Sequence, residues 1–280
     1  MKTISTVRPS PIAGSWYPDD KATLRSMIQQ FIDRAASPTT AEKVYGLIAP
    51  HAGYFYSGAT AGYAYRCVLG ASYDFCVVLS PLHDYQPYDL LTSAHSAYAT
   101  PLGEVRIATD LLEKIDQELH SSTGIAIQPI EYDREHSLEI QLPFLQVALK
   151  GSFQLIPIMV RTYDPEILKT TAQTIAKVLA GKRVLIIAST DLSHFYSQAT
   201  AVKLDKVMTG RFISFDPQGV LDAEAHQEGF ACGAGAVALA LWTAKLMGAT
   251  HVSLLHHSTS ADSSGDSSRV VGYAAAAITG

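Results

Sequence analysis

The sequence has few of the features that mark extracellular proteins. Only three cysteines, Cys67, Cys76 and Cys232, occur among its 280 residues, and their odd number and irregular spacing argue against a disulfide framework. The N-terminal residues lack the continuous apolar segment of a secretory signal. We therefore expect free thiols and a cytoplasmic location.

Long hydrophobic runs and clusters of basic residues are also missing. The longest apolar stretch, Phe230 to Ala244, is shorter than the roughly 20 residues that a membrane-spanning helix needs, so it predicts a buried helix. A formal net charge of -5 offers no basic surface to phosphate backbones. We expect neither a membrane nor a nucleic acid as a partner.

Apolar segments alternate with segments of helical periodicity along the whole chain. This alternation predicts one α/β domain over residues 1–280, with a largely parallel central sheet flanked by helices. A hairpin around residues 101–103 and the last two strands add antiparallel pairing, and residues 37–40 form a short linker. Strands are predicted at 44–50, 75–80, 153–160, 183–189, 252–257 and 269–278, and helices at 20–35, 57–69, 109–121, 135–149, 165–180, 198–214 and 232–247.

Two histidines follow prolines at the ends of apolar strands. His51 comes directly after Pro50, and His83 comes two residues after Pro81. Ligands of open α/β sheets bind outside the carboxyl ends of the strands, so we expect these side chains to converge. Imidazole is the commonest protein ligand of Zn, Cu and Fe, although each histidine taken alone could simply hydrogen-bond to a loop carbonyl. The two together favour a metal site.

A third strand end carries Asp191 and His194. Histidine near its ordinary pKa of about 6.5 suits general acid/base catalysis, and we expect Asp191 to hold the His194 ring. The alternative is that Asp191 or Ser193 caps the next helix. His136 and Glu139 share a helix face at i and i+3 but lack the H-E-x-x-H pattern, so we place His136 in the pocket wall with Glu139 supporting it.

Cys232 opens a glycine-rich helix. The unpaired N–H groups and positive dipole of a helix N-terminus favour thiolate, the form that binds metals or attacks electrophiles. The alternative is a small side chain packed at a helix start. Cys67 and Cys76 lie in a predicted helix and strand, and both are interpreted as structural.

Several ordered motifs together resemble the Memo family, also called AmmeMemoRadiSam system protein B. The resemblance covers nearly the whole chain, from the arm at residues 8–18 to Val271-Gly272-Tyr273. The motifs between them are Pro50-His51-Ala52-Gly53-Tyr54, Tyr56-Ser57-Gly58, Pro81-Leu82-His83, Glu135-His136-Ser137-Leu138-Glu139, Asp191-Leu192-Ser193-His194 and Ala231-Cys232-Gly233.

The resemblance implies a LigB-like architecture, that of the class III extradiol non-haem iron dioxygenases, and a metal site. By the family pattern His51, His83 and Cys232 are the metal ligands, and the catalytic residues His194, Asp191 and His136 line the same pocket. The family is linked to iron and copper. Its name implies an AMMECR-type protein and a radical-SAM enzyme as partners.

The chain departs from the dioxygenases in its third ligand, because a thiolate replaces a glutamate. A thiolate softens the site and favours copper, zinc or ferrous iron over magnesium or calcium. Our leading hypothesis is a metal-dependent, dioxygenase-like oxidoreductase that acts on a small molecule, with Tyr54 and Tyr56 at the pocket entrance. The alternatives are a non-catalytic metal-binding or peptide-binding scaffold in an AmmeMemoRadiSam modification system, and a zinc-dependent hydrolase.

Overall fold

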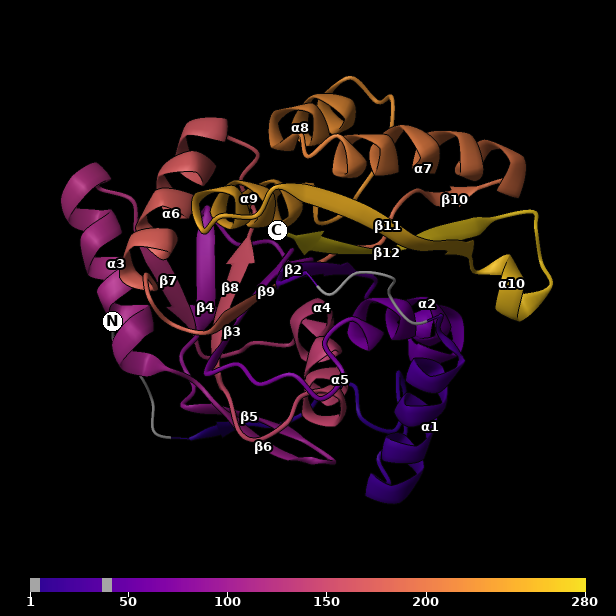
Figure 1. Ribbon diagram of the computed structural model, residues 1–280, viewed down its shortest axis with the longest axis horizontal. Helices are drawn as coiled ribbons and strands as arrows, with labels where there is room; N and C mark the ends of the chain where they lie inside the picture. Colours follow the sequence, from indigo (N-terminus) through magenta and orange to yellow (C-terminus); the bar gives the residue numbers. More distant parts are fainter. Residues whose placement is uncertain (1–5, 37–41) are drawn as a thin grey trace.

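The computed structural model describes residues 6–36 and 42–280 (Figure 1). The predicted linker at 37–40 lies outside the described residues. The strands are β1 (Val7–Arg8), β2 (Val44–Ala49), β3 (Phe75–Ser80), β4 (Leu90–Ser93), β5 (Ala97–Thr100), β6 (Gly103–Arg106), β7 (Ile127–Ile130), β8 (Gln154–Val160), β9 (Val184–Ser189), β10 (His194–Tyr196), β11 (His251–Thr259) and β12 (Val270–Thr279). The helices are α1 (Lys21–Arg34), α2 (Tyr54–Arg66), α3 (Thr109–Thr123), α4 (His136–Glu139), α5 (Gln141–Ala148), α6 (Pro165–Val178), α7 (Gln198–Ile213), α8 (Pro217–Ala225), α9 (Ala234–Leu246) and α10 (Ala261–Ser264).

A mixed nine-stranded sheet forms the centre, in the order β10-β12-β2-β9-β3-β8-β4-β7, with β11 paired to β12. The four middle strands β2, β9, β3 and β8 run parallel, while β12 pairs antiparallel with β2 and β11. This confirms the predicted α/β class with a parallel core and antiparallel C-terminal strands. The predicted hairpin is β5–β6, which belongs to a separate three-stranded sheet with β1.

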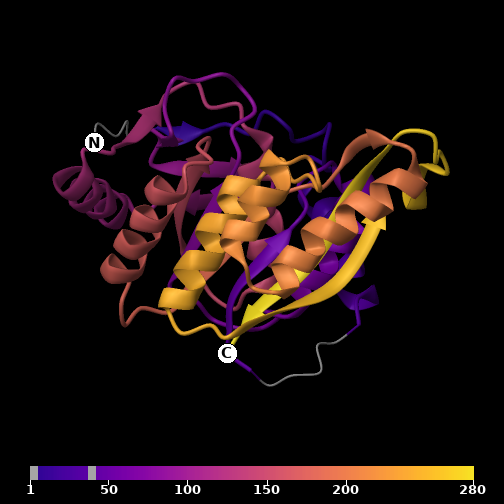
Figure 2. The same ribbon diagram turned by 90° about the horizontal axis from the view of Figure 1, so that it is seen from above.

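Helices cover both faces of the large sheet (Figures 1 and 2). The first face carries α6 and α9, with α3 and α8 packed beside them, and the second carries α2, with α1 and α5 against it. Nearly every residue of α9 is buried, which confirms the predicted buried helix. Parallel strands covered on both faces need continuous apolar sequence, as Val184–Ser189 illustrates.

The three strands whose ends carry polar residues are direct neighbours. β9 lies between β2 and β3, and the registers align Ala188 with both Ile48 and Leu79. Because these strands run parallel and in step, the segments that follow them emerge at one edge of the sheet. The predicted convergence of the strand ends is confirmed.

One predicted helix is divided into two. The segment predicted as a helix at 135–149 forms α4 and α5, which are separated at Ile140. Pro143 has no N–H to donate to the carbonyl four residues earlier, and it sits in the first turn of α5, where that bond is not needed. The break therefore follows from a proline that the helical periodicity masks.

A buried ionic cluster fixes the N-terminal arm to the body. Arg8 is 1% exposed, pairs with Asp133 at 2.8 Å and contacts the fully buried carboxylate of Glu139. Glu139 also accepts hydrogen bonds from Ser10 and from the Tyr17 hydroxyl, the latter at 2.7 Å. The cluster holds the arm so that the following residues reach the carboxyl edge of the sheet.

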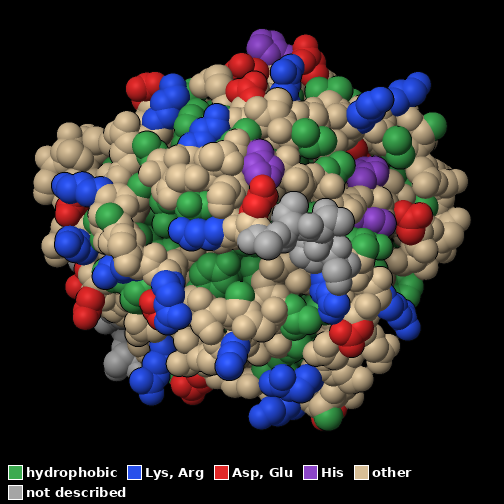
Figure 3. Space-filling model, viewed as in Figure 1, with side chains coloured by type: hydrophobic (Ala, Val, Ile, Leu, Met, Phe, Trp, Pro, Cys, Tyr) green, Lys and Arg blue, Asp and Glu red, His purple; other side chains and the backbone are tan. Residues whose placement is uncertain are grey.

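Acidic and basic side chains are interspersed over the face in Figure 3. Among the described residues, no helix has both the length and the apolar character needed to span a membrane.

We predict that Glu139→Gln lowers the free energy of unfolding by about 3 kcal/mol, because it removes one of the two carboxylates that pair with the buried Arg8 guanidinium. Urea unfolding followed by circular dichroism measures the change. The matched control is Asp74→Asn at the exposed Arg183–Asp74 pair, which should leave the unfolding midpoint unchanged. Equal midpoints for the two variants would show that the cluster does not stabilise the arm.

Candidate metal centre

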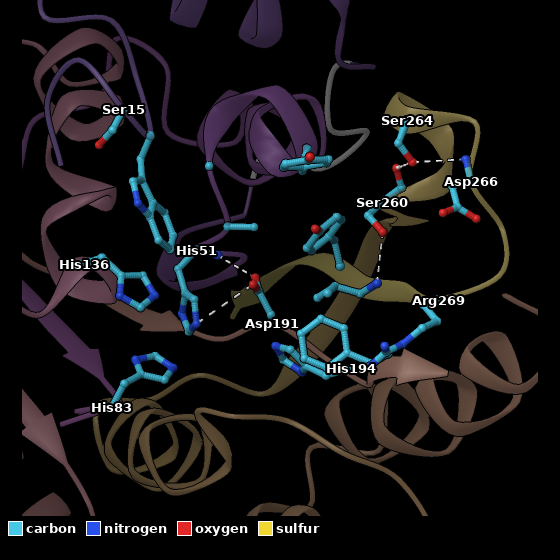
Figure 4. Close-up of a pocket in the computed structure, with 17 residues that line it drawn as sticks. Ser15, His51, His83, His136, Asp191, His194, Ser260, Ser264, Asp266 and Arg269 are labelled. Carbon is cyan, nitrogen blue, oxygen red and sulfur yellow. Dashed lines mark hydrogen bonds and ion pairs between the residues drawn. The ribbon is translucent and has the colours of Figure 1, made fainter. Parts of the chain in front are cut away.

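Three imidazole rings meet at the edge where β2 and β3 end. The ring nitrogens that His51, His83 and His136 offer as ligands all lie within 4.8 Å of one another. His51 is buried, whereas the side chains of His136 and His83 are 20% and 40% exposed. The group therefore reaches from the protein interior to the surface of a cavity (Figure 4).

Hydrogen bonds determine which nitrogen of each ring is free. Ser189 donates its single hydroxyl proton to the Ser137 carbonyl, at 2.6 Å, so its Oγ must accept from Nδ1–H of His51, at 3.1 Å. Glu135 accepts from Nδ1 of His83 at 2.9 Å and lies 3.3 Å from Nδ1 of His136. The Nε2 lone pairs of His83 and His136 are consequently left for a ligand, whereas Nε2 of His51 faces the sulfur of Cys232 at 3.1 Å.

Glu135 is the carboxylate that sequence reasoning missed. It caps α4, accepts from the backbone N–H of His83 at 2.6 Å, and orients two rings. The neighbouring His83 holds the pKa of Glu135 well below its usual range, against the opposing effect of burial. The predicted support by Glu139 is wrong, because Glu139 binds the N-terminal arm instead.

Cys232 lies behind His51, with its Sγ 3.1 Å from Nε2 of that ring and 3.3 Å from the backbone nitrogen of Asp191. The close approach depends on Gly233, where a Cβ would lie 2.4 Å from the Ser189 carbonyl oxygen. Cys232 is not part of the three-imidazole group, so the ligand set His51, His83 and Cys232 stays a prediction.

The protonation state of the Cys232 thiol differs from the prediction. Burial and the nearby Asp191 raise the pKa of Cys232 well above its ordinary value, so the thiol is protonated in the metal-free protein. The predicted thiolate is wrong because α9 begins only at Ala234 and burial outweighs the helix dipole. A bound cation would reverse the balance, since a coordinated thiol loses its proton.

Asp191 and His194 follow β9 but do not form the predicted pair. Asp191 accepts from the backbone N–H of His51 at 2.7 Å, and burial raises its pKa to about 7. The His194 ring is held by the Leu192 carbonyl, 2.7 Å from Nδ1, and burial lowers the His194 pKa. His194 thus keeps Nε2 free for proton transfer without help from Asp191.

A cavity of about 690 Å³ opens from the imidazole group toward solvent. Tyr56 lines it as predicted, whereas Tyr54 does not, because Tyr54 is buried and donates to the Ile140 carbonyl at 2.8 Å. Trp16, from the N-terminal arm, stacks on His136 with ring centroids 4.2 Å apart. The other lining residues are Ser15, His51, Ala52, Gly53, His83, Asp191, His194, Phe195, Ser260, Ser264, Asp266, Arg269, Val271 and Tyr273.

The donor set fits a transition metal. Burial lowers the pKa of His51 well below its ordinary value and that of His136 to about 4, so both rings are neutral at pH 7. Burial also lowers the pKa of His83, but Glu135 outweighs this effect and raises it. Imidazole nitrogens suit zinc, copper and iron, and a nearby sulfur strengthens that preference.

We predict that the metal-free protein loses stability with acid more steeply than its His136→Gln variant. Between pH values of about 4 and 6.5 the unfolded chain binds a proton at His136 that the folded protein excludes. The free energy of unfolding therefore falls with decreasing pH, by at most about 1.4 kcal/mol per unit from this ring. Urea unfolding across this range measures it, and parallel pH curves for the two proteins would contradict it.

Comparison with known proteins agrees with the motif resemblance. Residues 8–277 match the family described as Memo-like protein. A MEMO1 family protein of Nitrosopumilus maritimus is 32% identical over 273 residues, covering 96% of this chain and 98% of the relative. Similar proteins of Ignicoccus hospitalis and Methanothermobacter thermautotrophicus are 32% and 31% identical, over 96% of this chain and 97% and 99% of theirs. The chain therefore belongs to the Memo-like protein family.

Proposed function

We propose that this protein is a metal-dependent oxidoreductase that acts on a small molecule, with iron or copper at the carboxyl edge of the sheet. The observation that carries the proposal is the group of three imidazoles within 4.8 Å at the inner end of a cavity of about 690 Å³. Cavities of this size match small-molecule sites. The proposal includes a LigB-like architecture, in keeping with the resemblance to extradiol dioxygenases.

His51 and His83 would hold the metal, with Cys232 as the third ligand. The sulfur is 3.1 Å from Nε2 of His51, so two of the proposed ligand atoms already lie side by side. In this arrangement His136 stands beside the metal, where Trp16 and Glu135 fix its ring.

The buried acids at the site support a bound cation. Burial raises the pKa values of both Asp191 and Cys232, so the ionised forms are costly without a positive charge nearby. A divalent cation would stabilise both anions and would relieve this cost. The site is thus better suited to a cation than to the metal-free state.

The chain's own residues supply proton transfer and positioning. His194 lines the cavity with Nδ1–H on the Leu192 carbonyl, so its Nε2 can accept a proton from a substrate hydroxyl. Trp16 and Tyr56 offer flat apolar surfaces against which a planar substrate can pack. An iron or copper ion bound here would supply the electron transfer that these side chains cannot perform.

A second candidate function is zinc-dependent hydrolysis. Three neutral imidazoles with an open position form the ligand set of several catalytic zinc sites, and His51, His83 and His136 provide such a set. In that case His136 rather than Cys232 completes the site, so the two functions differ in their third ligand.

We predict that protein purified anaerobically, without added metal, contains about one equivalent of iron or copper. His51→Ala removes the metal because it deletes the most buried donor, and Cys232→Ser lowers the metal content at least about tenfold, since it replaces a soft ligand. Elemental analysis by mass spectrometry measures the content. His136→Gln should retain the metal, and His251→Ala, at a surface histidine, is the matched control.

Two results would contradict this assignment. If Cys232→Ser kept its full metal content and His136→Gln lost its metal, His136 would be the third ligand. That result would favour the zinc-dependent hydrolase. Full metal content in His51→Ala would show that the metal does not bind at this edge of the sheet.

A further inference from the structure

The outer part of the same cavity contains a polar set that the metal site does not use. Arg269 immediately precedes β12, and Val271 and Tyr273 follow at intervals of two residues. Side chains at i, i+2 and i+4 of a strand lie on one face, and these three all line the cavity. Val270 is fully buried instead, and a Cβ on Gly272 would lie 2.0 Å from Asp205. The alternation therefore directs one cation and one hydroxyl into the cavity.

Arg269 is positioned but not neutralised. Its guanidinium lies 5.3 Å from the centroid of the Phe195 ring, and within the described ranges 6–36 and 42–280 no carboxylate forms an ion pair with it. Figure 4 shows the Arg269 side chain extending toward His194. A guanidinium presents paired N–H donors that match a carboxylate, so an anion entering the cavity meets a ready partner.

Tyr273 adds a hydroxyl donor at the cavity wall. The residue as a whole is 1% exposed and lines the cavity, and its hydroxyl has no hydrogen-bond partner among the residues that the structure describes. The hydroxyl is therefore available to a group that enters the cavity. Burial raises the pKa of Tyr273, which keeps the hydroxyl protonated and able to donate.

Phe195 packs beside Arg269 in an unfavourable backbone conformation. It is 61% exposed, and its backbone φ of 65° lies in the left-handed region that bulky residues avoid. Burial does not compensate for this conformation, because the ring faces the cavity and Arg269. Strained residues of this kind are concentrated at ligand sites, where the strain sets the position of a side chain.

The charged side chains in this part of the cavity favour some anions over others. Asp266 lines the cavity near Arg269 in sequence, and hydrogen bonds from Ser268 to its carboxylate keep its pKa low, so it is ionised. One cation opposed by one carboxylate favours a singly charged group over a doubly charged phosphate.

We propose that the substrate is a small molecule with a carboxylate, bound by the Arg269 guanidinium and the Tyr273 hydroxyl; this names the substrate class of the proposed function. The carboxylate fixes the outer end of the substrate, and the rest of the molecule extends past His194 toward the imidazoles. Arg269 and Tyr273 are then specificity-determining residues.

Isothermal titration of the metal-free full chain with benzoate, benzamide and phenyl phosphate at about pH 8 tests the proposal. Wild-type protein should bind benzoate more tightly than either of the other two probes. Arg269→Gln should weaken benzoate binding about tenfold, and Tyr273→Phe about threefold, because each removes a donor to the carboxylate. Both variants should bind benzamide as the wild type does.

Arg25→Gln, at an exposed arginine on α1, is the matched control and should change nothing. Equal benzoate affinity in wild type and Arg269→Gln would overturn the proposal, as would tighter binding of phenyl phosphate or no binding of benzoate. The metal content of Arg269→Gln, measured separately, should equal that of the wild type. A wild type that binds benzoate through Arg269 but takes up no metal would refute the proposed function and leave the carboxylate site intact.

Discussion

The parallel pairing of β9 with both β2 and β3 is the constraint on which the candidate site depends. It places three strand ends in step at one edge of the sheet, so His51, Asp191 and His83 meet although they are far apart in the chain. Backbone hydrogen bonds and apolar packing in the core fix the strand ends from which the short loops that carry these residues begin. The N-terminal arm then adds Trp16 to the cavity wall, and the Arg8–Glu139 contact holds that arm in place.

Polar groups at this buried edge are supported by specific partners. Ser189 and Glu135 accept the Nδ1 protons of His51 and His83 and so direct the Nε2 atoms of these rings toward the site, which is a common arrangement of ligand histidines. Burial raises the pKa values of the two acids at this edge, Asp191 and Cys232, so their ionised forms need a positive charge nearby. A cation is the simplest partner for both, and this accounts for a thiol and a carboxyl group kept so close to imidazole rings.

Local sequence was sufficient for the long strands of the sheet, most of the long helices and the polar strand ends, because each depends on short-range periodicity and on the prolines that precede His51 and His83. The short strands β1, β7 and β10 and the helices α8 and α10 were not predicted. It failed where a choice between similar residues depends on distant contacts. Glu135 and Glu139 are both plausible supports for His136, and only the position of Arg8, 131 residues from Glu139, decides between them. Tyr54 and Tyr56 differ in the same way, since the start of α2 buries Tyr54 and leaves Tyr56 at the cavity.

The central claim is that a transition metal binds where these strand ends converge. Anomalous diffraction from crystals of the purified protein, collected at the iron and copper absorption edges, locates the metal and identifies it in one measurement. The account predicts a single peak within bonding distance, about 2.0 to 2.3 Å, of Nε2 of His51, Nε2 of His83 and Sγ of Cys232. A well-ordered cavity without a peak in metal-containing protein, or a peak elsewhere in the molecule, would contradict it.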